Sequence, residues 1–357
     1  MKISLSICIM ALCMGLLTAC TAESPNSQAL AGAKQTEGSD APAQGSEPQA
    51  RENGPGAVDV NIGVIKGPTA IGMVKFMAEA DGGEIDSNNY SFVISASVDE
   101  IVPKIVQGEI DIAAVLPNLS SVLYHNTQGK VQVLAINTLG MISIVETGDT
   151  ISSVEDLRGK TIFASGKGGP LEFALNYILR SNGIDPERDL NIEWKSEHTE
   201  VVTSLLTGTT SIALLPQPFV TTAQMSDENV RIAIDLNEEW DRIQETAEAP
   251  SALIMGVYIV RTDFAAQNPE ATADFLDRYA ASVRYVNSNL NEAAALVGQY
   301  DIFPEAVAQR AIPHCNISFI EGREMREKLS GYLQVLLGQE PQSVGGSLPG
   351  DDFYFSR

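Results

Sequence analysis

The sequence predicts a two-lobed α/β fold on the strength of three observations. A pattern of apolar helix, glycine and short apolar strand ending in Leu-Pro occurs twice, over residues 98–117 and 198–216. Strand-like and helix-like segments alternate after residue 58, as they do in sheets that are flanked by helices. The roughly three hundred residues that follow this point are large for one hydrophobic core and natural for two.

The two copies of the repeat align at their glycines, Gly108 and Gly208. Each glycine follows the last periodic apolar residue of a helix, where a left-handed C-cap conformation suits a residue without Cβ. The apolar runs around Ile112 and Ile212 do not alternate with polar residues, which indicates strands covered on both faces. Loops at the carboxyl ends of such strands are where ligands usually bind.

The N-terminus predicts an exported protein. Lys2 precedes an apolar run, residues 3–17, that is too short to span a bilayer but fits the central region of a signal peptide, which we assign to residues 1–19. The sequence Leu-Thr-Ala-Cys that closes it resembles a bacterial lipobox, so Cys20 is the expected lipidation site. The alternative is an ordinary cleaved signal peptide with an incidental cysteine.

Residues 20–57 predict a flexible tether. They are rich in Ser, Gly, Ala, Pro, Gln and Glu and contain almost no large apolar side chains, so they cannot bury enough surface to fold. Together with the lipid anchor, the tether predicts a protein held on the extracytoplasmic face of the cell membrane.

Charge and cysteine content narrow the function. The formal net charge of −23 and the absence of a basic stripe exclude nucleic acid as a partner. Cys8 and Cys13 would leave with the signal peptide and Cys20 would carry lipid, so Cys315 would remain alone, with no intramolecular disulfide. We expect Cys315 to be a small buried apolar residue rather than a reactive thiol.

The first part of the folded region begins with a strand over 58–66. Gly67, Pro68 and Thr69 then form a turn that opens a helix over 70–80. A strand over 90–95, the first repeat, a short helix near Leu119 and a strand over 131–137 follow.

The middle part begins with a strand over 141–145. The run Ser153–Lys160 predicts a capped helical turn that ends at Gly159, and we interpret it as a passage between lobes. A strand over 161–164 and a glycine-rich loop over 165–169 come next. Pro170 opens a helix over 170–182, at a position where its missing N–H costs nothing.

The last part begins after the second repeat. A strand over 230–235 is followed by a run over 253–261 that returns the chain to the first lobe. Helices over 269–287, 291–300, 304–312 and 325–337 pack around that lobe, and the aromatic C-terminal tail could dock on it. We therefore assign residues 58–142 plus 254–357 to lobe 1 and residues 143–253 to lobe 2.

Several motifs, in this order and spacing, resemble one family of proteins: Gly108–Ala113, Ser153–Ile162, the glycine-rich loop with Glu172–Leu175, and Leu214–Phe219. The chain after the tether resembles ABC-transporter solute-binding lipoproteins of the nitrate, sulfonate and taurine type, which include thiamine-precursor binders. The resemblance implies a type II periplasmic-binding-protein fold, in which two crossover strands join two α/β lobes around a ligand cleft. It also implies a monomer without cofactor or catalysis that delivers a small solute to membrane permease and ATPase subunits.

The site expected in such a cleft consists of loops that end strands and open helices. Their free N–H groups and positive helix ends suit carboxylate, sulfonate or phosphate oxygens. The candidate ligand-binding residues are Gly67, Pro68, Thr69, Ala70, Ser97, Pro117, Asn118, Ser165, Gly168, Gly169, Gln217 and Pro218. The alternative for Thr69 and Ser97 is a plain N-cap role, and for Asn118 and Gln217 a polar side chain facing water.

The ligand is a small organic molecule or oxyanion. A dianion should be matched by arginine forks, yet these loops hold only Lys66 and Lys167, which disfavours phosphate ligands. A monoanion held by backbone donors remains open, as does a neutral heterocycle stacked on Tyr124, Phe219 or Trp240.

Catalytic and metal motifs are not expected. The histidines are scattered without a His-Glu-x-x-His pattern, one cysteine cannot make a thiolate metal site, and no serine lies in Gly-x-Ser-x-Gly. An enzyme on the same bilobal scaffold is the rival hypothesis, but the fungal thiamine-precursor synthases that share the resemblance carry a cysteine-rich motif that this chain lacks. An extracellular ligand-sensing receptor is a further alternative.

Overall fold

The computed structural model describes residues 57–247 and 251–357. The chain divides into two units, Met1–Arg51 and Glu52–Arg357, and the second unit is described by itself. The predicted signal peptide, the lipidation site at Cys20 and nearly all of the predicted tether lie outside the described residues.

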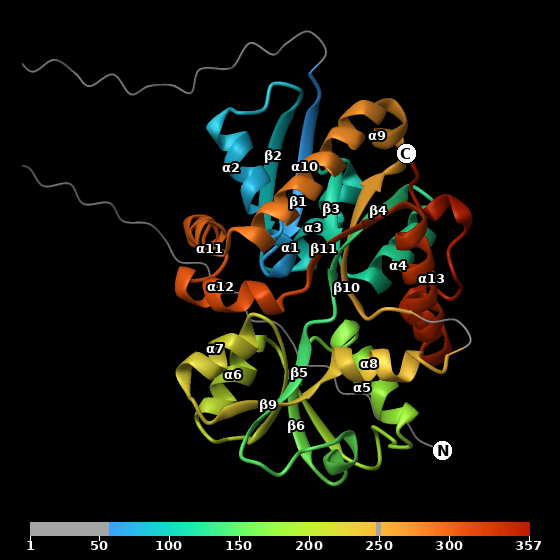
Figure 1. Cartoon of the computed structure of the whole chain (residues 1–357). Coiled ribbons are helices and arrows are strands. Elements are labelled where there is room, and N and C mark those ends of the chain that lie inside the picture. The colour runs from blue at the N-terminus through green and yellow to red at the C-terminus, as the bar shows by residue number, and fades with distance from the viewer. Residues whose placement is uncertain (1–56, 248–250) are drawn as a thin grey trace, which may run out of the picture. The chain divides into compact units, whose positions relative to one another are not determined.

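The larger sheet has six strands in the order β11-β4-β10-β3-β1-β2 (Figure 1). Its strands are β1 (Asp59–Ile65), β2 (Asn89–Ser95), β3 (Ile112–Val115), β4 (Val131–Leu139), β10 (Ile254–Arg261) and β11 (Ile317–Glu321). β1 is parallel to β2 and β3, and β10 runs antiparallel between β3 and β4. We call this sheet and its helices lobe 1.

The second sheet has five strands in the order β7-β6-β8-β5-β9. Its strands are β5 (Ile142–Thr147), β6 (Thr161–Ser165), β7 (Asn191–Lys195), β8 (Ile212–Pro216) and β9 (Val230–Asp235). We call this sheet and its helices lobe 2. Two helix-flanked sheets confirm the predicted α/β fold class, whereas the exact residue boundaries of the domains stay a prediction.

The interpretation of the run Ser153–Lys160 as a passage between lobes is wrong. β5 already pairs with β8 and β9, so the chain enters lobe 2 at Gly140–Met141, ahead of that strand. The run Ser153–Lys160 instead forms a 3₁₀ turn, Val154–Leu157, closed by a capping box between Ser153 and Asp156. Because a capped turn of this kind is satisfied by its own local hydrogen bonds, its sequence carries no information about which sheet it adjoins.

Helices surround both sheets. Lobe 1 carries α1 (Pro68–Ile71), α2 (Val74–Gly82), α3 (Val98–Gln107), α4 (Pro117–Thr127), α9 (Thr262–Gln267), α10 (Pro269–Ser288), α11 (Leu290–Gln299), α12 (Glu305–Ala311) and α13 (Gly322–Gln339). Lobe 2 carries α5 (Pro170–Ser181), α6 (His198–Leu206), α7 (Phe219–Ser226) and α8 (Leu236–Gln244). The single helix predicted over 70–80 is divided near Gly72, whose backbone packs against Tyr279 and Ile317 without room for a Cβ.

The repeat occupies equivalent places in the two sheets. α3 ends at Gly108 with φ 82°, and Gly208, with φ 72°, follows α6. The strands after these glycines, β3 and β8, are buried along their whole length and lie inside their sheets. The repeat therefore builds one central strand of each lobe, as the non-alternating apolar runs predict.

The core also bears out the expectations for Cys315 and for the C-terminal tail. Cys315 is fully buried, and burial raises the pKa of its thiol to about 12, so it is not a reactive thiolate. Phe353 is buried and packs edge-on against Tyr124, and Tyr354 bridges to Val133 of β4. The tail is thus docked on lobe 1.

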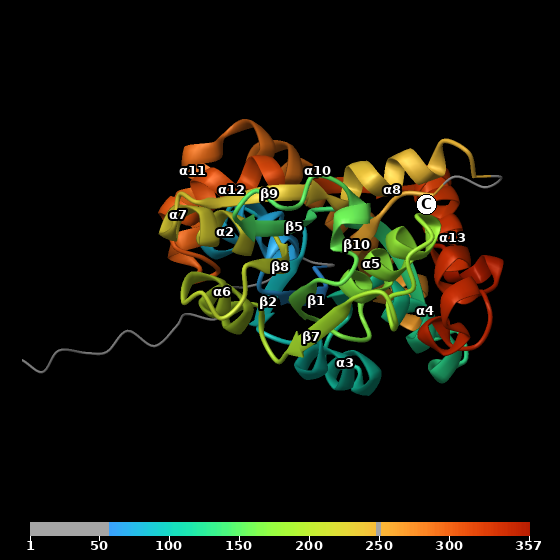
Figure 2. The same ribbon diagram turned by 90° about the horizontal axis from the view of Figure 1, so that it is seen from below.

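The lobes touch on two sides. In Figures 1 and 2, α7 lies beside α12, where the Phe219 and Phe303 rings meet edge-on with centroids 5.5 Å apart. On the other side, the ring centroids of Trp240 in α8 and Tyr332 in α13 lie 5.7 Å apart. Gln339 Nε2 donates a hydrogen bond to the Phe173 carbonyl at 3.3 Å. Across 57–247 and 251–357, no helix is both long enough and apolar enough to cross a bilayer.

Candidate functional site

A cavity of about 150 Å³ lies between the two sheets and takes its walls from both lobes. We call it the interlobe cavity. Its lining residues come from the ends of strands, the starts of helices and the crossover segments: Ile65, Lys66, Gly67, Pro68, Thr69, Val115, Leu116, Met141, Leu171, His198, Pro216, Gln217, Pro218, Phe219 and Met255. Most of these side chains are apolar, so the cavity favours a ligand with an apolar part.

Besides the short α1, which begins at Pro68, four helices begin at this cavity. Leu116 precedes α4, Leu171 lies in the first turn of α5, His198 opens α6 and Phe219 opens α7. None of these four helix starts has a side-chain cap, whereas α3 is capped by Ser97 and α8 by Asp235. First-turn N–H groups without a side-chain partner can donate to a ligand oxygen, and the helix dipoles favour negative charge there. The Thr221 N–H in α7 is not one of them, because it donates to Gln217 Oε1.

Lobe 2 supplies one side of the cavity wall, and the titratable lining residue on that side is His198. Its Nδ1 lies 2.5 Å from Ser165 Oγ, and its ring lies 4.9 Å from the Phe219 ring. Burial lowers the pKa of His198 to about 4, because the charged imidazolium would lose its hydration. The imidazole is therefore neutral near pH 7 and offers one donor and one acceptor rather than a charge.

The Ser165–His198 pair does not have the geometry of a nucleophile and its base. Ser165 is 1% exposed, and within the described part of the chain no carboxylate bonds to the other ring nitrogen of His198. A nucleophile needs access to substrate and an oriented base, so the serine hydroxyl instead fixes the rotation of the imidazole. Nor does any group of three or more His, Cys, Asp or Glu among the described residues have the arrangement of a metal site.

The formal charge at the cavity is low. Lys66 is the charged side chain among the lining residues, and its Nζ donates to the Asp301 carbonyl at 2.6 Å and lies 3.1 Å from Asp301 Oδ2. Its charge is thus already matched by a carboxylate of lobe 1. With His198 neutral, the described walls offer a ligand hydrogen-bond donors but no free cation.

The structure brings five of the predicted site residues together in the interlobe cavity: Gly67, Pro68, Thr69, Gln217 and Pro218. Thr69 Oγ1 donates to the Ile65 carbonyl at 2.7 Å, which leaves its oxygen lone pairs available. These five come from the loop after β1 and the loop after β8, one in each lobe.

The other predicted residues do not line this cavity. Ala70 is buried, Ser97 accepts from the Asp99 N–H as a plain N-cap, and Ser165 lies behind His198. Pro117 and Asn118 are buried in the first turn of α4, where Asn118 Nδ2 points to the Ser343 carbonyl at 3.4 Å. Gly169 precedes α5, and the Gly168 N–H donates to Glu172 at 2.6 Å.

Of the three aromatic residues considered for stacking, one borders the cavity. Phe219 lines it, Trp240 is fully buried between α8 and α13, and Tyr124 bonds Asp352 of the C-terminal tail. His198 was not predicted as a site residue, although it is the first residue of the second repeat helix. Met141, Leu171 and Met255 also escaped, because nothing in sequence distinguishes apolar cavity walls from core.

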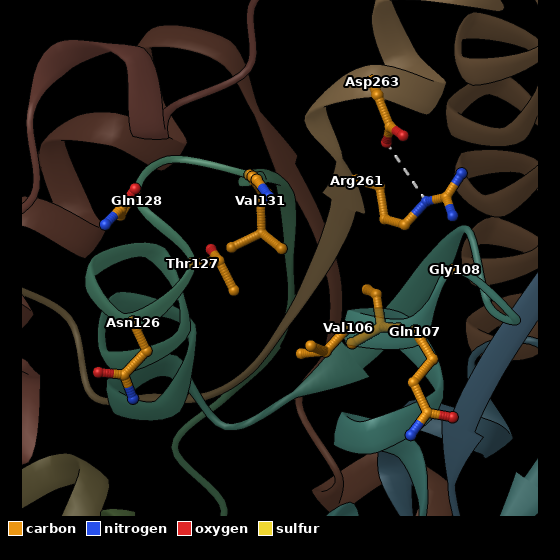
Figure 3. A pocket seen from close by; sticks show the side chains of 11 residues that line it. Val106, Gln107, Gly108, Asn126, Thr127, Gln128, Val131, Arg261 and Asp263 are labelled. Carbon is orange, nitrogen blue, oxygen red and sulfur yellow. Dashed lines mark ion pairs between the residues drawn. The ribbon is translucent and has the colours of Figure 1, made fainter.

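A larger cavity, of about 570 Å³, opens at the opposite edge of the lobe 1 sheet (Figure 3). Figure 3 shows it between the end of α3, at Val106–Gly108, and the end of α4, at Asn126–Gln128. Arg261 forms its floor with ion pairs of 3.4 Å to Asp111 and to Asp263. It receives nothing from lobe 2, and its arginine already faces two carboxylates, so the interlobe cavity is the stronger candidate for a binding site.

The sequence matches a family model described as ABC transporter, phosphonate, periplasmic substrate-binding protein, over residues 88–293. The chain belongs to this family of extracytoplasmic substrate-binding proteins of ABC transporters. The sequence-based resemblance to ABC-transporter binding proteins is thereby confirmed. No curated protein matches the sequence.

Solved structures of the same class share the fold. An ABC transporter protein from Parabacteroides distasonis is 21% identical with a TM-score of 0.69, over 84% of this chain and 99% of that one. The aliphatic sulphonate binding protein SsuA from Escherichia coli is 16% identical with a TM-score of 0.66, over 83% and 95%. The nitrate-binding protein NrtA from Synechocystis is 14% identical with a TM-score of 0.53, over 70% and 69%.

Proposed function

We propose that this chain is the solute-binding lipoprotein of an ABC importer and that its interlobe cavity binds a small organic solute that is monoanionic or neutral. The observation that carries the proposal is a mainly apolar cavity at which four uncapped helices begin and at which no cation is free. Closure of the lobes over the solute and delivery to a membrane permease complete the function, with no chemical step.

The charge of the cavity favours a sulfonate or carboxylate over a phosphonate. A phosphonate acquires a second negative charge near neutral pH, and an unmatched buried charge is costly. Uncharged N–H donors with a neutral His198 can match one negative charge spread over several oxygens, as in a sulfonate. The charge of the cavity therefore favours a sulfonate or a carboxylate as the solute.

Membrane attachment is part of the proposal. Residues 1–19 serve as a lipoprotein signal peptide, Cys20 carries the lipid, and residues 20–57 form the tether of a monomeric two-lobed protein. The candidate contacts are Gly67, Pro68, Thr69, Gln217 and Pro218 together with His198 and Phe219, which all line the cavity.

Thermal unfolding with a ligand panel tests the proposal. The panel contains alkanesulfonates, nitrate, carboxylates, alkylphosphonates, pyrimidines, thiamine precursors and flavins, added after co-purified ligand has been removed by unfolding and refolding. Saturation at a hundredfold over Kd stabilises the protein by about 2.7 kcal/mol, which raises the Tm by several degrees. A rise with an organic monoanion or a neutral compound supports the proposal, and a rise with phosphonates alone contradicts it.

A further inference from the structure

Gln217 forms part of a wall shared by two cavities. Besides the interlobe cavity, it lines a polar cavity of about 180 Å³ whose other lining residues are Gly140, Met141, Ser143, Ile232, Asp235, Pro313, His314 and Asn316. Met141 and Gln217 are the two residues common to both linings. Gln217 is 6% exposed, so its amide is a largely desolvated group in the wall that the two cavities share.

The chemistry of Thr221 fixes which end of the Gln217 amide is free. The backbone N–H of Thr221 lies 3.2 Å from Gln217 Oε1, and the Thr221 hydroxyl donates to the same oxygen at 2.8 Å. A backbone N–H can only donate, so the amide atom that faces it must be the oxygen. The amide nitrogen makes no hydrogen bond to any described residue, and its two N–H donors remain for a ligand.

We propose that Gln217, held by Thr221, selects solutes that present a hydrogen-bond acceptor group joined to an apolar body, and rejects the matching ammonium compounds. This inference rests on the proposed function and narrows it to one class of solute. A buried donor left unpaired costs free energy, and an ammonium group offers it no acceptor. The selection therefore acts through a penalty on the wrong solute as well as a bond to the right one.

The charges around Gln217 decide on which side the acceptor group binds. Asp235 faces the polar cavity, where its Oδ1 already accepts the Asn237 N–H at 2.8 Å as the N-cap of α8. An oxyanion in that compartment would meet a carboxylate. On the other side lie the neutral His198 and the start of α7 at Phe219, where the N-cap residue Pro218 supplies no capping side chain. The acceptor group accordingly binds in the interlobe cavity, with its apolar body against Met255 and Leu171.

The test compares 1-butanesulfonate with butylammonium, which share an apolar body and differ in the head group. Calorimetric titrations at pH 8 use the full chain in wild-type form, as Gln217→Glu and as Gln224→Glu. The Gln217→Glu variant keeps an oxygen for Thr221 and replaces the two N–H donors by a second carboxylate oxygen. Gln224 is an exposed residue of α7 and lines neither cavity. The Gln224→Glu variant therefore adds the same charge outside the site.

Wild-type protein and the Gln224→Glu variant should bind butanesulfonate at least tenfold more tightly than butylammonium. The Gln217→Glu variant should bind butanesulfonate at least tenfold more weakly than the wild type does. Thr221→Val, which leaves only the backbone N–H of residue 221 to hold the amide oxygen, should lose a smaller part of the preference. If Gln217→Glu binds butanesulfonate as the wild type does, the inference about Gln217 fails and the proposed function stands. If the wild type prefers butylammonium, or binds neither compound, the inferred class of solute is wrong as well.

Discussion

His198 illustrates how a single side chain in this protein is set by its surroundings. Its imidazole lies between the Ser165 hydroxyl and the Phe219 ring, and burial lowers its pKa to about 4 from an ordinary value of 6.5. A neutral ring at this place adds no positive charge to the cavity near pH 7. The residue thereby contributes to the preference for a weakly charged solute.

The depressed pKa of His198 has a consequence for stability. The unfolded chain binds the proton more tightly than the folded protein, so stability is lost as pH falls from about 6.5 towards about 4. Between pH 7 and pH 5 the loss from this residue amounts to up to about 2 kcal/mol. Urea denaturation of wild type and His198→Asn at both pH values measures it. Parallel losses in the two proteins would show that His198 is not the group responsible.

Individual site residues were predictable where the backbone dictates them. Gly67, Pro68 and Pro218 follow from turn chemistry at the ends of strands, and the structure places them in the cavity. Pro117 and Asn118 occupy the same position in the repeat as the cavity residues after β8, yet they are buried within lobe 1 against Ser343. The sequence marks a helix start, but which first-turn residue faces the cleft depends on how that helix is rotated on its sheet.

At the scale of elements, the repeat gives the two lobes a shared unit of helix, glycine and central strand. Gly108 and Gly208 both adopt left-handed conformations, at φ 82° and φ 72°. Their surroundings differ: a Cβ on Gly108 would collide with the Arg261 guanidinium, whereas one on Gly208 would meet nothing within 4 Å. The guanidinium is held there by its ion pair of 3.4 Å with Asp111 and by a second one with Asp263, which Figure 3 shows.

This difference makes the two glycines a matched pair for mutation. Gly208→Ala should cost about 1 kcal/mol of unfolding free energy, the strain of a left-handed residue with a Cβ. Gly108→Ala should cost about 1 kcal/mol more, because Arg261 must also move away from Asp111. Chemical denaturation of both variants gives the comparison. Equal costs would mean that Arg261 moves aside freely and that its ion pair contributes little.

Several elements with strong local signals were predicted, but α7 and α8 were not, although Asp235 caps α8. β9 over Val230–Asp235 and the long α10 were found from apolar patterning and a proline start. β7 and β11 escaped, because each is a short strand at a sheet edge, β7 with polar residues on alternate positions. Pairing with a partner strand, and not the local sequence pattern, makes these segments strands, and the partner lies far away in the sequence.

At the scale of the molecule, the two lobes enclose the interlobe cavity and the polar cavity beside it, and they touch at two further places. The α7–α12 contact includes Phe219, which also lines the cavity, while the α8–α13 contact buries Trp240 and Tyr332 completely. Separation of the lobes on the α7–α12 side, as the proposed function requires, would open the cavity past Phe219.

The anchoring proposal concerns the molecule as a whole and is tested in cells. Cys20→Ser should release the protein from the membrane fraction, because the signal would be processed without addition of lipid. Immunoblots of membrane and soluble extracytoplasmic fractions measure the change. Cys13→Ser, the same substitution within the predicted apolar region of the signal, serves as the control and should stay in the membrane. Retention of Cys20→Ser would contradict a lipid anchor at this residue.

The most direct test of the account is a calorimetric titration of the ligand-free protein with 1-butanesulfonate and with butylphosphonate at pH 8, where the second compound is a dianion. A cavity with neutral His198, with Lys66 matched by Asp301 and with uncapped helix starts should bind the sulfonate at least tenfold more tightly. Tighter binding of the phosphonate would contradict the account, because it would require a free positive charge that these walls do not hold.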